Sequence, residues 1–402
     1  MSSPAVAQLR QAATIRERCA NIAQAVAEGR STHFVLDRSR LVDAADRVAQ
    51  VTRENYPTLR IPYHSRWRHF EAGGIDRKTE LDLRLSGLDA AAQARARIDL
   101  TVVSVLLDAG AGAAWHYVEP SSGRRFERSE GLGVASFRGF LQGLFSSDPA
   151  QPLRADAAAL QRMDASTLAT MFQVRPDNPL VGLEGRAHLL RRLGDALALQ
   201  HGSFGHYGRP GALHDRLALK PVTAARLLQS LLDTLSGIWL ADNELDGQPL
   251  GDCWRHPLAG GSGASAGWVP FHKLSQWLCY SLLEPFEWSG TPVSGLEALT
   301  GLPEYRNGGL LLDTGVIVPR DPAFTQRRHT TGDEAVVEWR ALTVSLLDDL
   351  APLVRERLGR GEAELPLARI LEGGTWAAGR ALARERREGR PPLAIESDGT
   401  VF

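Results

Sequence analysis

The chain has 402 residues, of which 43% are hydrophobic and 23% are charged, and its formal net charge is −1. This length predicts two or three domains, or one large helical domain. The balanced charge argues against a general electrostatic grip on DNA or RNA, which requires a clear excess of lysine and arginine. We therefore expect no nucleic-acid polymer as a partner.

Cysteine usage and hydropathy favour a cytoplasmic protein. Cys19, Cys253 and Cys279 lie far apart and form no CxxC pair, which fits a reducing compartment and predicts neither a disulfide framework nor a zinc site. No run approaches the roughly 18 apolar residues that a membrane-spanning helix needs. The first residues also lack the apolar core of a signal peptide. We expect a cytoplasmic location and no membrane partner.

Helical periodicity dominates the beginning of the chain. Residues 5–28 have a helical pattern that ends at Gly29, a residue type that commonly terminates helices. A second apolar stripe occupies 41–51 and is entered from Asp37. Residues 89–109 begin with an aspartate suited to cap a helix and become strongly apolar toward their end.

A short β-hairpin is predicted after this third helix. Residues 116–120 and 124–129 flank a Ser-Ser-Gly turn and have the composition of two paired strands. A helix over 132–145 should follow, with Ser129 as its cap. A further short extended segment is predicted at 315–319.

The rest of the chain is again mostly helical. Apolar periodicity predicts helices over 183–197, 223–241, 273–282, 334–354 and 367–387, the last of them rich in arginine. Two spans, 200–216 and 246–270, look like irregular connections, and long loops of this kind are often functional or mobile. The predicted fold class is mostly α, a multi-helix globular core with a small β-hairpin element. We expect an N-terminal helical region with the hairpin at 1–150 and a C-terminal helical region at 151–402.

A polar stripe lies on the helix predicted from residue 273. Lys273, Gln276 and Tyr280 share one helical face, whereas the apolar residues between them can pack inward. Polar groups removed from water cost free energy unless they are paired, so this face predicts a pocket rather than a packed core.

A carboxylate follows this helix in the segment LTGLPEYRNGG. Glu304 stands beside Tyr305 and Arg306, just before a pair of glycines. Because Glu304 follows a proline, it suits a helix N-terminus, and the alternative is that it only complements the helix dipole. In that alternative Lys273 is only a solvated charge.

A second group of candidates lies between residues 108 and 130. Asp108 ends a helix in a glycine-rich turn, and Trp115, Tyr117 and Glu119 follow on the predicted hairpin. An aromatic ring with a nearby carboxylate can hold a small planar amide. The alternative is that the two aromatic residues are core residues and Glu119 lies on the hairpin surface. Glu130 is either a further ligand or an acidic residue that favours a helix start.

Several cofactor and metal signatures are missing from the sequence. It contains no P-loop and no GxGxxG after a strand. Its 11 histidines are scattered, with no HxH or HExxH spacing. We expect neither an organic cofactor nor a catalytic metal.

Five segments resemble a known family when they are taken together and in order. They are LLDAGAGAAWHY, RSEGLGVASF, DNPLVGLEGRAHLL, PFHKLSQWLCYSL and LTGLPEYRNGGLLLDTGV. This set resembles the uracil-catabolism protein four family of fungi and bacteria, over roughly residues 30–355. The resemblance implies a role in a uracil degradation route that passes through a uridine nucleotide. It further implies a step after ring opening, on a ribosylurea-type intermediate.

A more distant similarity links the chain to the queuosine 5′-phosphate N-glycosidase family. That family has a helical core related to helix-hairpin-helix DNA glycosylases, with a Lys…Gln helix and a later Asp-Tyr-Arg segment. Lys273 and Gln276 match the helix, and Glu304, Tyr305 and Arg306 match the segment, with glutamate in place of the catalytic aspartate. The resemblance implies a glycosylase-like core and cleavage of an N-ribosidic bond.

Both resemblances and the residue chemistry point to one hydrolytic reaction. We expect cleavage of ribosylurea 5-phosphate to urea and ribose 5-phosphate, with Glu304 and Lys273 as the catalytic residues. The expected substrate contacts are Asp108, Trp115, Tyr117, Glu119, Glu130, Gln276, Tyr280, Tyr305 and Arg306.

Other functions remain open at this stage. One alternative is a non-catalytic partner or carrier for the ring-opening enzyme of the same pathway. Another alternative is a hydrolase of a ureido or amide bond. The expected ligand is a small phosphorylated ribosyl compound, and association with other uracil-degradation enzymes is possible.

Overall fold

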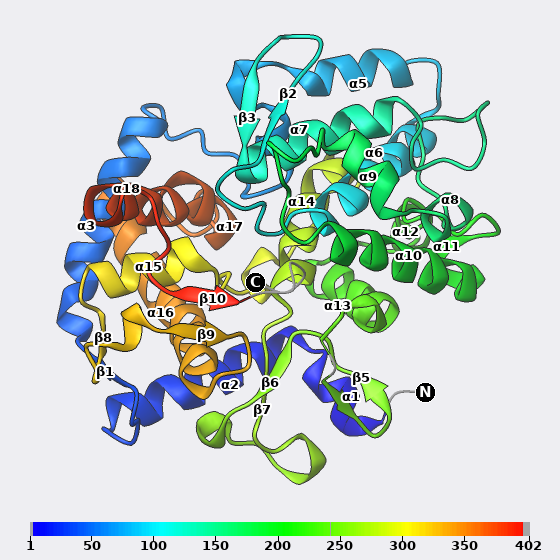
Figure 1. The fold of residues 1–402 in the computed structure, drawn as a ribbon. Coiled ribbons are helices and arrows are strands. Elements are labelled where there is room, and N and C mark those ends of the chain that lie inside the picture. The colour runs from blue at the N-terminus through cyan, green and yellow to red at the C-terminus, as the bar shows by residue number, and fades with distance from the viewer. Residues whose placement is uncertain (1–2, 242, 397–402) are drawn as a thin grey trace. The chain divides into compact units, whose positions relative to one another are not determined.

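The computed structural model of the chain describes residues 3–241 and 243–396, and in this part the fold is mostly helical with five small two-stranded sheets (Figure 1). The predicted fold class is confirmed at this level. The described residues form two compact units, unit 1 from residues 3–64, 243–276 and 295–396, and unit 2 from residues 65–241 and 277–294. The division at residue 150 stays a prediction about regions of the sequence.

Unit 1 is built around one long helix, α16, because this helix is buried on nearly every side over its first half. α2 and α3 pack on α16, and α15 packs on α18 (Figure 1). The helices of unit 1 are α1 (Pro4–Leu9), α2 (Ala12–Ala27), α3 (Leu41–Asn55), α15 (Tyr305–Asp313), α16 (Glu334–Leu358), α17 (Leu367–Ile370), α18 (Trp376–Arg387) and the first turn of α14 (Lys273–Trp288).

Four of the two-stranded sheets belong to unit 1. They pair β1 (Phe34–Leu36) with β8 (Ile317–Pro319), β4 (Glu244–Leu245) with β5 (Gln248–Pro249), β6 (Cys253–Arg255) with β7 (Trp268–Pro270), and β9 (Arg328–Thr330) with β10 (Ala394–Glu396). The last pair is parallel and the other three are antiparallel. β8 confirms the extended segment predicted at 315–319.

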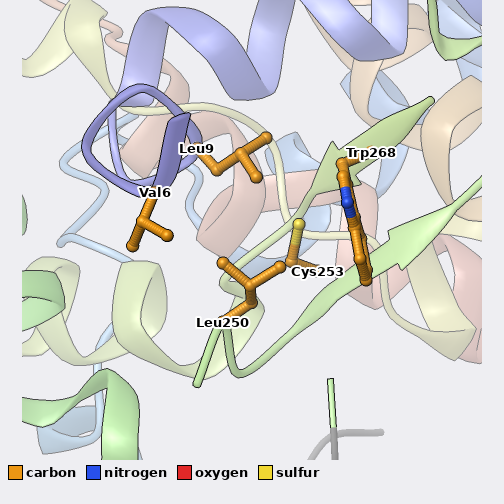
Figure 2. Packing of buried hydrophobic residues seen from close by; sticks show 5 residues of the cluster. All are labelled: Val6, Leu9, Leu250, Cys253 and Trp268. Atoms are coloured by element: carbon orange, nitrogen blue, oxygen red, sulfur yellow. The ribbon is translucent and has the colours of Figure 1, made fainter. Parts of the chain in front are cut away.

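A small apolar cluster attaches helix α1 to the β6–β7 hairpin. Val6 and Leu9 of α1 point toward Leu250, Cys253 and Trp268 (Figure 2). The exposed fractions of these side chains range from 0% to 6%, so the cluster is a true part of the core of unit 1.

Unit 2 contains the longest run of consecutive helices. They are α4 (Trp67–Phe70), α5 (Arg77–Leu85), α6 (Ala90–Leu106), α7 (Arg128–Leu141), α8 (Ala157–Gln161), α9 (Ala165–Met171), α10 (Leu183–Leu199), α11 (His201–Phe204), α12 (Ala212–Leu217) and α13 (Ala224–Leu235), followed by the remainder of α14. The predicted hairpin is confirmed as β2 (His116–Val118) paired antiparallel with β3 (Arg125–Glu127). Both strands of the hairpin pack on α7.

Helix capping confirms one predicted boundary and corrects another. Asp89 caps α6, as expected, by accepting the N–H of Ala92. The predicted cap at Ser129 is wrong, because α7 already begins at Arg128 with Glu127 in the cap position.

Three longer predictions need correction. The helix expected over 5–28 is broken into α1 and α2, since the backbone of Gln11 is extended. The span 200–216, predicted to be irregular, contains the two short helices α11 and α12. The span 246–270 contains the β6–β7 hairpin, whose strands are hidden in the sequence by the glycine-rich connection between them.

Short turns complete the described chain. They are the 3-10 turns η1 (Arg38–Arg40), η2 (Ala72–Gly74), η3 (Ser236–Ile238), η4 (Pro257–Ala259), η5 (Gly263–Ser265), η6 (Leu296–Ala298) and η7 (Phe324–Gln326), and the π-helical turn η8 (Leu371–Thr375). None of the helices within 3–241 and 243–396 combines the length and apolar character that a membrane crossing requires.

Candidate functional site

The carboxylate of Glu304 caps helix α15 in unit 1. Its two oxygens accept the backbone N–H groups of Arg306, at 2.7 Å, and Asn307, at 2.5 Å. This geometry follows from the local sequence, because Leu-Pro-Glu places an extended residue directly before the helix. The side chain is half-buried, so the carboxylate is held at a fixed place and is partly removed from solvent.

Burial sets the ionisation of this carboxylate. Removal from water raises the pKa of Glu304 above its ordinary value of 4.5, and the two N–H bonds together with the charges of Lys273 and of protonated His64 act in the opposite direction. Burial, together with the charge of Glu304, also raises the pKa of Tyr305 to about 12. An acid with a raised pKa beside basic side chains is an arrangement typical of proton-transfer sites.

A buried ion pair fixes the first turn of α14, where Lys273 lies. Asp252 accepts two hydrogen bonds from Arg340, at 2.8 and 2.7 Å, and one from the backbone N–H of Lys273 at 3.0 Å. Burial opposes ionisation of Asp252, but the charge and hydrogen bonds of Arg340 win and lower its pKa. The guanidinium of Arg340 also stacks over the ring of Phe271, 4.1 Å from its centroid. The backbone of Lys273 is therefore held in place at the start of α14.

A histidine–glutamate pair lies in the same unit and was missed by the sequence analysis. Nδ1 of His64 lies 2.9 Å from an oxygen of Glu372, whose other oxygen accepts the hydroxyl of Tyr56 at 3.1 Å. Glu372 belongs to the π-helical turn η8, and π-helical turns often occur at functional sites. The pair of glycines after Glu372, in the middle of a predicted helix, is the signal that the sequence offered.

Gln276 is used within the protein. Its side-chain N–H groups donate to Thr300 Oγ1 at 2.7 Å and to the carbonyl of Phe271 at 3.1 Å, and its side-chain oxygen accepts the Thr300 N–H at 3.0 Å. The side chain is fully buried, as is that of Tyr280 further along α14, in unit 2. Gln276 and Tyr280 are therefore interior residues, and Lys273 is the half-buried member of the polar stripe.

The hairpin candidates Trp115, Tyr117 and Glu119 lie in the interior of unit 2. Trp115 is 1% exposed, and its Nε1–H donates to the carbonyl of Phe172 at 2.9 Å. Tyr117 is buried opposite Phe126 of the neighbouring strand. These contacts favour the interpretation of both rings as core residues.

Glu119 forms the centre of an ion network. It accepts from Arg77 at 2.8 and 2.6 Å, from Arg138 at 2.7 Å, and from the hydroxyl of Ser122 at 2.7 Å. Although burial acts to raise its pKa, these hydrogen bonds lower the pKa to about 2. A fully buried carboxylate with this many donors has little capacity left for a ligand.

Asp108 and Glu130 are the remaining candidates in unit 2, and both act on Arg66. Asp108 Oδ2 lies 3.1 Å from Arg66 Nη1, and Glu130 lies close enough to contribute its charge to the same guanidinium. Arg66 itself was not recognised from the sequence, because it lies in a segment without periodicity.

The candidates therefore divide between the two units. Unit 1 holds Lys273, Gln276, Glu304, Tyr305 and Arg306, and unit 2 holds the rest. In the described part of the chain, no three His, Cys, Asp or Glu side chains form a group suited to a metal ion. What unit 1 offers chemically is a fixed, partly buried carboxylate with basic and phenolic neighbours, as in hydrolases that use a single acid.

Comparison with known proteins shows the family to which this mostly helical protein belongs. Residues 8–402 match the family described as protein of unknown function DUF1688, and the chain belongs to this family. It is 39% identical over 412 residues to uracil catabolism protein 4 of Lachancea kluyveri, with 93% of each chain covered. It is 40% identical over 415 residues to protein urg3 of Schizosaccharomyces pombe, with all of both chains covered. The resemblance seen in the five sequence segments is confirmed.

Proposed function

We propose that this protein is an N-glycosidase-type hydrolase of uracil catabolism that cleaves ribosylurea 5-phosphate. The pathway is suggested by the name of the Lachancea kluyveri relative, which covers 93% of this chain. A helical core related to helix-hairpin-helix glycosylases is part of the same proposal. The reaction type is argued from the surroundings of Glu304.

The proposed reaction consumes one water molecule. The bond between C1′ of the ribose and the urea nitrogen breaks, and its electron pair leaves with the nitrogen. The water oxygen bonds to C1′, and the two protons it carries are divided between the new hydroxyl and the departing urea. The products are urea and ribose 5-phosphate, so atoms and charge balance without an oxidant or a reductant.

The observation that supports this reaction is the fixed, half-buried carboxylate of Glu304 with its raised pKa. Breaking an N-ribosidic bond builds positive charge on C1′ and the ring oxygen, and a held carboxylate stabilises that charge. The same group accepts a proton from the attacking water, for which a pKa nearer to neutral is favourable. The two N–H bonds from α15 fix its direction before the substrate arrives.

The neighbouring residues take supporting roles in this proposal. Lys273 tunes the ionisation of Glu304 and, with Arg306, supplies positive charge for a 5-phosphate. Tyr305 remains a phenol at neutral pH and orients a sugar hydroxyl. Gln276 acts indirectly, since its hydrogen bonds tie the start of α14 to Thr300 near the beginning of the segment that carries Glu304.

The test is the purified protein alone with ribosylurea 5-phosphate. We expect urea and ribose 5-phosphate in equal amounts, and a loss of about a hundredfold or more in kcat for Glu304→Gln, because removal of one stabilising group has an effect of this order. Glutamine can still accept an N–H bond from α15, so the variant should fold. Glu297→Gln, an exposed glutamate just before this segment, is the matched control and should retain full activity.

The other outcomes identify the competing functions. Release of ammonia or carbamate in place of urea would show hydrolysis of the ureido bond. Binding without any product would show a carrier or a partner of the ring-opening enzyme. Unchanged turnover in Glu304→Gln would remove this residue from the mechanism.

A further inference from the structure

A buried arginine of unit 1, Arg18 of α2, is short of hydrogen-bond acceptors. Its side chain is fully buried, yet within the described residues Nε and Nη1 have no hydrogen-bond partner. Nη2 makes only a long hydrogen bond, 3.4 Å, to Ser265 Oγ. The carboxylate of Glu17 lies 3.6 Å from Nε, which is too far for a hydrogen bond. A buried guanidinium without acceptors is unfavourable, so its surroundings call for a further group.

Residues 260–264, in the connection between β6 and β7, cover this guanidinium. Their sequence is Gly-Gly-Ser-Gly-Ala, and all five are exposed. A Cβ atom added to Gly261 would overlap Nη1 of Arg18, and the φ of Gly261 is 88°, so only glycine fits there. An exposed stretch of backbone therefore lies between the guanidinium and the solvent.

The hydrogen bonds of this segment leave donors without partners. The carbonyl oxygens of Gly260, Ser262 and Gly263 already accept hydrogen bonds, at 2.8, 3.0 and 3.2 Å. Within residues 3–241 and 243–396, the backbone N–H groups of Gly260, Gly261 and Ser262 have no acceptor, and the Ser262 hydroxyl makes no capping bond. Successive N–H groups of this kind attract anions.

The segment is held at its two ends. Asn21 of α2 donates to the carbonyl of Ala259 at 3.0 Å, and the hydroxyl of Ser265 donates to Gln8 Oε1 of α1 at 2.8 Å. In the described chain, the hydrogen bonds that tie this connection to α1 and α2 all lie at residues 259 and 265. Residues 260–264 can therefore move away from the guanidinium while both ends stay attached.

We propose that Arg18 and residues 260–262 form a binding site for a phosphate group, and that the segment moves outward to admit it. The phosphate oxygens accept from Nη1 of Arg18, from the N–H groups of Gly261 and Ser262, and from the Ser262 hydroxyl. A phosphate group has enough acceptor oxygens for all these donors, and its charge offsets that of the buried guanidinium. The proposal does not depend on the reaction proposed for Glu304.

The charged groups of the neighbouring elements leave this place to an anion from solution. Arg255 adds a second positive charge, because its Nη1–H donates to a carbonyl of the same connection at 2.9 Å. Glu17 is 51% exposed, so solvent weakens its effect on the guanidinium. Glu338 already accepts a hydroxyl within the protein, and Asp252 is matched by Arg340.

The test is phosphate binding to the whole protein, measured by calorimetry with inorganic phosphate. Arg18→Met should raise Kd at least about tenfold, because a charged donor is lost. Tm without phosphate should not fall, since methionine fills the space and no buried carboxylate loses its partner. Ser262→Ala, an exposed change, should raise Kd about threefold and tests the site if Arg18→Met does not fold.

The matched control is Arg16→Met, which removes the same charge from α2 at a residue that pairs with Asp348. It should leave Kd unchanged. Inorganic phosphate should also slow hydrogen exchange at residues 260–262. Unchanged Kd in Arg18→Met with a lowered Tm, or phosphate binding that is lost only in Arg306→Ala, would overturn the inference and leave a structural arginine.

A second ligand identifies the source of the phosphate group. Ribose 5-phosphate is measured against the same variants. If Arg18→Met weakens both ligands equally, the site holds the phosphate of a larger molecule, and if it weakens inorganic phosphate alone, the site holds the free ion. Neither result requires release of urea, so the reaction proposed at Glu304 is tested separately.

Discussion

Glu304 has a structural role in helix α15, and we propose a catalytic role for the same side chain. Its carboxylate satisfies two N–H groups that the first turn of α15 would otherwise leave without partners. The sequence offered a helix-dipole role and a catalytic role as alternatives, and the structure places Glu304 as the N-terminal cap of α15. The two are compatible, because a cap holds an acid in one place.

The ionisation of Glu304 gives a prediction about pH. Lys273 lowers the pKa of Glu304, so Lys273→Met should raise that pKa and move the acidic limb of the kcat profile to higher pH. The expected limb of the unmutated protein lies above pH 4.5, the ordinary value, since burial raises the pKa. The measurement is kcat between acidic and neutral pH. Lys220→Met, an exposed lysine of unit 2, should leave the limb in place.

The free energy of unfolding should also depend on the ionisation of Glu304, and here the protonated form is the favourable one. A carboxyl whose pKa is raised in the folded state favours folding when it is protonated, below pH 4.5, and loses this contribution as the pH rises through its folded-state pKa. The Tm of Glu304→Gln minus the Tm of the unmutated protein should therefore be larger at neutral pH than in acid. A Tm difference that grows toward acidic pH would contradict the assigned direction of the pKa shift.

Arg306 gives a prediction about phosphate. Arg306→Ala keeps the backbone N–H that Glu304 accepts, so the cap remains while the guanidinium is lost. We expect KM for ribosylurea 5-phosphate to rise about tenfold or more, and KM for dephosphorylated ribosylurea to stay within about twofold. Arg384→Ala, on the exposed face of α18, is the control. Equal effects on both substrates would reject phosphate recognition at this residue.

At the scale of elements, α15 depends on a very close approach by α18. A Cβ atom added to Gly379 of α18 would lie 2.0 Å from the backbone carbonyl oxygen of Arg306, so glycine is required there. Since α15 carries the Glu304 cap at its start, displacement of this helix displaces the carboxylate. Helix packing in unit 1 thus sets the position of the candidate catalytic group.

Gly379→Ala should test this dependence. We expect a loss of stability of about 1–3 kcal/mol from overpacking, and a fall in kcat larger than the fall in folded protein. The readouts are urea unfolding and kcat on the folded fraction. Gly361→Ala, a glycine whose added Cβ would meet only a side-chain oxygen at 3.9 Å, should change neither. Normal kcat with reduced stability would separate the packing of α15 from catalysis.

The sequence predicted elements well where the signal was local. The cap at Asp89, the hairpin at 116–129 and the extended segment at 315–319 depend on neighbouring residues, and each was confirmed. The β6–β7 hairpin was missed because its two strands are separated by a glycine-rich connection with no helical or strand period.

The candidate site was predictable only in its contiguous part. Glu304, Tyr305 and Arg306 are adjacent, so their grouping was visible in the sequence. His64 and Glu372 meet across more than 300 positions, with |i−j| of 308, and no periodic pattern carries such a pairing. Arg66 was invisible for the same reason, since its partners Ser104 and Asp108 lie on a later helix and its end.

At the scale of the molecule, unit 1 is assembled from three separated stretches of chain. α2 and α3, near the N-terminus, pack on α16, which begins at Glu334. A regional division at residue 150 would separate these partners. The units defined by contacts and the regions defined by sequence composition therefore describe different properties.

Expression of fragment 151–402 should show the consequence. Without α2 and α3 the buried faces of α16 meet solvent, so we expect no cooperative thermal transition and a tendency to aggregate. Circular dichroism with heating is the measurement, and co-expression with fragment 1–150 should restore part of the folded signal. A cooperative transition in the isolated fragment would contradict the prediction.

The discontinuous make-up of unit 1 also bears on how the chain is synthesised. When α2 and α3 leave the ribosome, the helix that covers their apolar faces has not yet been translated, and the whole run of unit 2 helices emerges first. The apolar faces of α2 and α3 therefore stay exposed during this part of translation. Chaperones are most useful in this period. Faster translation of the middle of the gene would shorten that exposure.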